Sequence, residues 1–79
     1  MIWKRINNGE YLFIGKGYHF DFAIEKVLSD ETKTDYYNLL EVGDYSVELI
    51  KSFSSILQLM SYAWFLDINY NRGELIIHV

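Results

Sequence analysis

Two alternating polar residues offer the best spacing for metal or acid–base chemistry in this 79-residue sequence. On a strand, His19 and Asp21 would share one face, as a metal site or a general base with an orienting carboxylate requires. A metal site needs three or four ligands, and only His78 is a plausible third. Two solvent-facing residues of an amphipathic strand explain the pattern more simply, so we expect no metal site.

The other reactive side chains lack the spacing of catalytic or cofactor-binding motifs. The serines of residues 52–55 have no Gly-x-Ser-x-Gly elbow and no histidine nearby. Gly15-Lys16-Gly17 lacks the rest of a phosphate-binding loop, and the acids of residues 30–35 lack the glycine and terminal glutamate of a calcium loop. The chain has no cysteine, which excludes thiolate and disulfide chemistry. We therefore expect a non-enzymatic protein without a cofactor.

The charge of the chain is acidic and unevenly distributed. A net charge of −4 argues against nucleic acid as the main partner, because Lys and Arg supply affinity for phosphates. Residues 41–79 carry only two basic residues against five acids. These acids are Glu41, Asp44, Glu48, Asp67 and Glu74. They predict an acidic face that binds a basic protein surface, although a solvated face that keeps an apolar chain soluble is the simpler alternative.

The elements that position these residues begin with a predicted hairpin. Asn8-Gly9 lies between two apolar runs, residues 3–6 and 11–14, and this dipeptide is typical of a two-residue hairpin turn. Such a turn sets Trp3 opposite Ile14. Gly15-Lys16-Gly17 then permits a reversal of the chain.

Residues 18–25 alternate in polarity, with every even position apolar. The alternation predicts a half-buried strand with Tyr18, Phe20, Phe22 and Ile24 facing inward. A helix over residues 20–28, with Asp21 as its N-cap, is the competing interpretation. A polar loop over residues 29–35 and a returning strand over residues 36–42 complete the predicted meander.

After Gly43, the spacing of apolar residues predicts one amphipathic helix that Asp44 or Ser46 caps. Its apolar stripe consists of Leu49, Ile50, Phe53, Ile56, Leu57 and Met60. Alternation over residues 62–70 and the loop at 71–73 predict a C-terminal β-hairpin. We thus expect a single α+β domain over residues 1–79, with two layers and the element order ββββαββ.

So short a chain has little stability to spare. Burial of its apolar surface contributes about 120 kcal/mol and ordering of its residues costs about the same. One helix covers only one face of a sheet, so we expect apolar surface to remain open. Trp3, Tyr11 and Phe13 are the predicted aromatic residues of this partner-binding or dimer surface. A homodimer would supply further burial.

These features favour a small protein-binding module, with a protein as its partner. A narrower hypothesis is an inhibitor or immunity-type protein of a phage or mobile element that blocks a larger nucleic-acid-handling enzyme. It is motivated by the acidic half and by 31 of 79 residues being Ile, Lys, Asn, Tyr or Phe, as an A+T-rich gene would encode.

The alternative hypothesis is a small-ligand-binding protein with an aromatic pocket between helix and sheet. The predicted pocket residues are Tyr18, Phe20, Tyr62, Trp64 and Tyr70. Packed aromatics without a cavity are the simpler interpretation in so small a core. The longest uncharged stretch, residues 52–66, is too short and too polar to span a membrane, and no secretory signal is visible, so we expect a cytoplasmic location.

Overall fold

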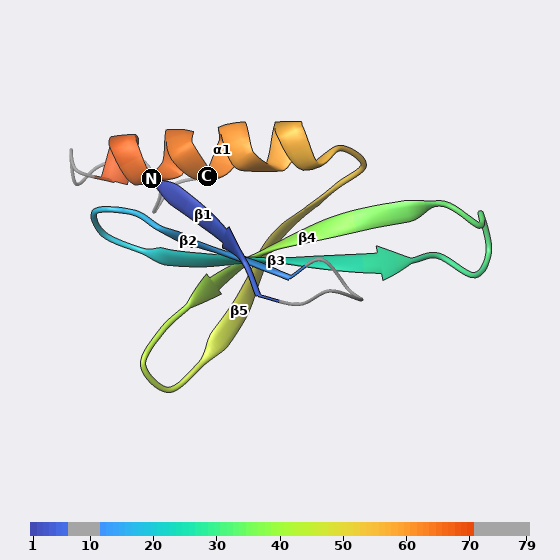
Figure 1. The fold of residues 1–79 in the computed structure, drawn as a ribbon, viewed down its shortest axis with the longest axis horizontal. Coiled ribbons are helices and arrows are strands. Elements are labelled where there is room, and N and C mark those ends of the chain that lie inside the picture. Colours follow the sequence, from blue (N-terminus) through green and yellow to red (C-terminus); the bar gives the residue numbers. More distant parts are fainter. Residues whose placement is uncertain (7–11, 71–79) are drawn as a thin grey trace.

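In the computed structural model, residues 1–6 and 12–70 are described, except for the side chain of Tyr70. They form one antiparallel sheet of five strands in sequential order, followed by one helix (Figure 1). The elements are β1 (Ile2–Arg5), β2 (Phe13–Lys16), β3 (Asp21–Leu28), β4 (Asp35–Val42), β5 (Val47–Phe53) and α1 (Ile56–Tyr70). The α+β class is confirmed, whereas the predicted order ββββαββ is wrong because a fifth strand precedes the helix.

The strand predicted over residues 18–25 is confirmed from Asp21 onward, where β3 begins and runs to Leu28, and the competing helix is excluded. Phe22 and Ile24 are fully buried, and Ile24 pairs with the equally buried Leu39 of β4. These side chains meet Leu59, Ala63 and Leu66 of α1 to form the core. In Figure 1, α1 runs along one side of the sheet.

The first hairpin has a register one residue away from the prediction. Trp3 pairs with Gly15 rather than Ile14, and the Ile6 N–H donates to the Leu12 carbonyl oxygen at 2.9 Å. The Trp3 indole lies across Gly15, where an added Cβ would come within 2.7 Å of the ring. This packing, which only glycine permits, sets the register and makes Gly15 a strand residue. Asn8-Gly9 itself lies outside the described residues.

The helix predicted from Asp44 or Ser46 to about Ser61 is wrong in its first half, because residues 47–53 form β5. The Gly43 N–H donates to the Ser46 carbonyl oxygen at 2.8 Å, which closes a turn between β4 and β5 and leaves neither Asp44 nor Ser46 as a helix cap. A bulge opposite Leu39 and Leu40 inserts one residue into β5. Both Ile50 and Phe53 consequently pack against the core, with a spacing that imitates a helix.

The helix begins after Ser55 instead. The Ser55 side-chain oxygen accepts the Gln58 N–H at 3.5 Å, and its carbonyl oxygen accepts the Leu59 N–H at 3.1 Å. α1 then continues through residues 62–70, which the alternation had assigned to a strand. These residues form a helix rather than a strand because Leu59, Ala63 and Leu66 then lie on one side and are buried together. The rest of the predicted C-terminal hairpin, residues 71–79, lies outside the described chain.

Candidate functional site

α1 carries a second apolar stripe on the side away from the sheet. This outer face consists of Leu57, Ser61, Trp64, Phe65 and Ile68. Leu57 is 73% exposed and Trp64 is 58% exposed, and Phe65 and Ile68 are also exposed. Their spacing of four, seven, eight and eleven residues from Leu57 places them in one row along the helix. A helix that is apolar on both sides is typical of a buried helix, so an exposed outer face is unusual.

The single charged residue of α1 lies on the inner side. Asp67 is 4% exposed. Its carboxylate accepts the Tyr18 N–H at 3.0 and 2.9 Å and the His19 N–H at 3.1 Å. Gly17 makes room for it, since an added Cβ would lie 2.5 Å from the carboxylate. Asp67 therefore anchors the C-terminal half of α1 to the turn between β2 and β3, and this anchor directs the outer face toward solvent.

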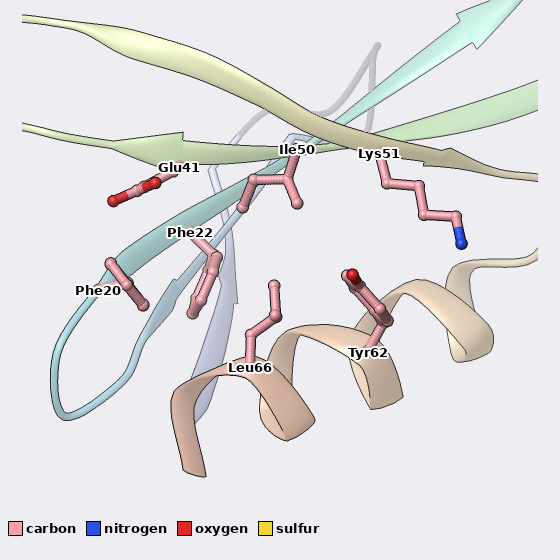
Figure 2. Close-up of a pocket in the computed structure, with 7 residues that line it drawn as sticks. All are labelled: Phe20, Phe22, Glu41, Ile50, Lys51, Tyr62 and Leu66. Atoms are coloured by element: carbon pink, nitrogen blue, oxygen red, sulfur yellow. The ribbon is translucent and has the colours of Figure 1, made fainter. Parts of the chain in front are cut away.

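A cavity of about 360 Å³ lies between α1 and the sheet, on the side of β4 and β5 (Figure 2). It is lined by Phe20, Phe22, Glu41, Ile50, Lys51, Tyr62 and Leu66. Figure 2 shows Glu41 toward one end of the cavity and Lys51 toward the other, above Tyr62. The Lys51 ammonium lies 5.3 Å from the centre of the Tyr62 ring, a cation–π distance. The cavity thus has apolar walls and two ends of opposite charge.

The predicted acidic face is divided in the structure. Half-buried Glu41 lines the cavity, and the Asp67 carboxylate accepts a hydrogen bond from the β2–β3 turn. Asp44 and Glu48 are exposed, and Glu48 pairs directly with Glu41 across β4 and β5. Three acids are therefore gathered on the β4–β5 hairpin, and Glu74 lies outside the described residues.

The predicted aromatic pocket is gathered only in part. Phe20 and Tyr62 do line the cavity. Tyr18 is 95% exposed in the β2–β3 turn, and Trp64 lies on the outer face of α1. The side chain of Tyr70 is outside the described part of the chain.

Two of the three aromatic residues predicted for the partner-binding sheet surface also lie elsewhere. Trp3 and Phe13 are half-buried and pack against the core on the side that α1 covers. The rings of Trp3 and Phe22 have centres 6.5 Å apart. Tyr11 is outside the described residues.

The side of the sheet away from α1 carries a row of aliphatic residues. Successive cross-strand pairs align Ile14, Ala23, Leu40 and Leu49 from β2 to β5. Because neighbouring strand residues point to opposite faces, this row faces away from core residues Phe22 and Leu39. No helix or strand of residues 1–6 and 12–70 covers it, and Leu49 is 60% exposed.

Sequence reasoning missed the outer face of α1 because it read residues 62–70 as a strand. Two signals could have located it. Ser55 and Gln58 have the Ser-x-x-Gln spacing of a helix start. Leu57, Trp64 and Ile68 continue from that start at helical spacing.

Comparisons with protein-family models, with curated proteins and with solved structures give no match to this chain. In the described chain, no helix is long and apolar enough to cross a membrane. His, Asp and Glu side chains form no group of three or more that could hold a metal ion among these same residues.

Proposed function

We propose that this chain is a small, non-enzymatic protein-binding module and that the outer face of α1 is its binding surface. One observation carries the proposal: four large apolar side chains stand exposed in one row along a helix whose only charged residue is buried. Contiguous apolar surface of this kind marks interaction sites on soluble proteins. The aromatic Trp64, near the middle of the row, has the residue type that dominates binding energy at protein interfaces.

A second copy of the chain is the partner that the outer face fits best. Leu57, Ser61, Trp64 and Ile68 follow spacings of four, three and four residues, which is the seam of two packed helices. The seam has no charge that would repel its own copy, and Ser61 is small enough for close approach. A two-fold dimer would bury the same face on both subunits and would add stability to a short chain.

In its narrower form, the proposal is an inhibitor or immunity-type protein of a phage or mobile element that acts on a nucleic-acid-handling enzyme. The β4–β5 hairpin would then face a basic protein surface, since Glu41, Asp44 and Glu48 gather there. Glu41 and Glu48 are directly opposed, and like charges in this position repel each other, so a cationic partner would relieve the repulsion. Charge reversal of all three acids should abolish capture of such an enzyme, without a lower melting temperature.

Sedimentation velocity tests the dimer at micromolar concentrations. We expect the wild-type chain to sediment as a dimer and Trp64→Lys to sediment as a monomer with an unchanged circular dichroism spectrum. Tyr45→Lys is the matched control, because Tyr45 is fully exposed but lies in the turn between β4 and β5. A monomeric wild-type chain would refute the homodimer.

If the wild-type chain is monomeric, affinity capture with the same two variants tests binding to another protein. A partner that uses the outer face should be retained by wild type and Tyr45→Lys and lost with Trp64→Lys. Capture that Trp64→Lys leaves unchanged would contradict the outer face as the binding surface.

A further inference from the structure

The cavity between α1 and the sheet has the dimensions and walls of a small-molecule site. Its volume of about 360 Å³ falls in the range of ligand pockets, which is about 300 to 1,000 Å³. Phe20, Phe22 and Tyr62 supply aromatic walls, and Ile50 and Leu66 supply aliphatic ones. An occupant with an apolar body would pack against these side chains and leave water.

One end of the cavity favours a positive charge. Glu41 lines this end, and Glu48 is its direct cross-strand partner on the same face of the sheet. Among the described residues, Lys26 forms an ion pair with Asp35, and neither Glu41 nor Glu48 takes part in it. Two carboxylates side by side attract an ammonium group, and its binding reduces the electrostatic repulsion between them.

The other end favours a negative charge. The bulge in β5 sets Lys51 beside Ile50 in the cavity lining, and the Lys51 ammonium lies over the rings of Tyr62 and Phe53. Lys51 pairs with Leu39, two residues from Glu41 along β4, so the Cα atoms of Glu41 and Lys51 are about 8 Å apart. A ligand must therefore carry its two charges at separate ends.

We infer that this cavity binds a small zwitterion with an apolar body, whose ammonium group contacts Glu41 and whose carboxylate contacts Lys51. The site is independent of the proposed dimer, because Tyr62 and Leu66 face the sheet whereas Leu57 and Trp64 face solvent. Loss of ligand binding and loss of dimer formation can therefore be separated by variants on the two sides of α1.

The test uses three probes with one body and different charges: 4-(aminomethyl)benzoate, benzylamine and benzoate. Each is titrated into the full chain labelled with nitrogen-15, and amide shifts are followed by NMR. We expect the zwitterion to bind about tenfold more tightly than either singly charged probe, since each charged end adds a charge-assisted hydrogen bond. The largest shifts should centre on Phe20, Ile50 and Tyr62. Equal affinities for the three probes, or no saturable shifts, would overturn the inference.

Two substitutions assign the ends. Glu41→Gln should weaken binding of the zwitterion and of benzylamine about tenfold and leave the affinity for benzoate unchanged. Lys51→Gln should instead weaken binding of the zwitterion and of benzoate. Glu31→Gln and Lys4→Gln remove the same charges at exposed positions outside the cavity and should change nothing. Unaltered zwitterion affinity in both cavity variants contradicts the site. If a cavity variant unfolds, Ile50→Phe provides the second test, because a larger side chain should fill the cavity and abolish binding of all three probes.

Discussion

The two faces of α1 are similar in composition and opposite in surroundings. The inner face buries Leu59, Ala63 and Leu66 against the sheet, while the outer face leaves Leu57 and Trp64 in solvent. The decisive difference is a polar one. Asp67 on the inner side meets two backbone N–H groups of the β2–β3 turn, which set the rotation of the helix on the sheet. Apolar residue type alone therefore does not decide which side of this helix packs.

The largest expected effect compares two leucines on the two faces. Leu59→Ala should lower the free energy of unfolding by about 3 kcal/mol, because it leaves a cavity in a fully buried position. Leu57→Ala removes the same atoms from an exposed position and should change it by less than about 0.5 kcal/mol in dilute solution. Urea denaturation below the association concentration measures both. Similar losses for the two variants would mean that the outer face is also packed in the monomer.

Removal of the Asp67 charge should have the next largest effect. Asp67→Asn keeps the size of the side chain but loses charge-assisted hydrogen bonds from the Tyr18 and His19 N–H groups. We therefore expect the free energy of unfolding to fall by about 2 kcal/mol. Asp44→Asn is the control, since Asp44 is exposed in the β4–β5 turn. Urea denaturation of the two variants measures the difference. Equal stability of both would show that the anchor does not set the position of α1.

The smallest effect concerns the start of the helix, which both faces share. Ser55→Ala removes the oxygen that accepts the Gln58 N–H and should lower the free energy of unfolding by about 1 kcal/mol. Ser54→Ala, at the exposed neighbouring position, should be neutral. The same denaturation series measures this pair. A larger effect of Ser54→Ala would place the helix start one residue earlier.

The parts of the fold that the sequence predicted are those in which local pattern and tertiary packing agree. The polarity alternation around Phe22 and Ile24 matches a strand with one buried face, and both side chains are indeed in the core. The register of the first hairpin could not be predicted in this way. It depends on the Trp3 indole lying across Gly15, which is a contact between strands rather than a property of the Asn8-Gly9 dipeptide.

The misplaced helix has a similar explanation. A bulge in β5 turns both Ile50 and Phe53 toward the core, and the resulting spacing is indistinguishable in sequence from one face of a helix. The predicted set of pocket residues depends on the same misplaced helix, because it treats residues 62–70 as a strand. A strand over these residues places Tyr62 and Trp64 on one side, whereas in the structure Tyr62 lines the cavity and Trp64 is exposed. On the observed helix, these two residues point in different directions.

The Asp67 anchor also bears on the order in which the molecule assembles. Tyr18 and Asp67 are 49 residues apart in sequence. At a synthesis rate of about 5 to 20 residues per second, the β2–β3 turn leaves the ribosome about 2 to 10 seconds before its carboxylate partner. The strands can pair during this interval, but Phe22 and Ile24 have no helix to cover them. We therefore expect the nascent sheet to be the most aggregation-prone stage of biogenesis and docking of α1 to be the event that ends it.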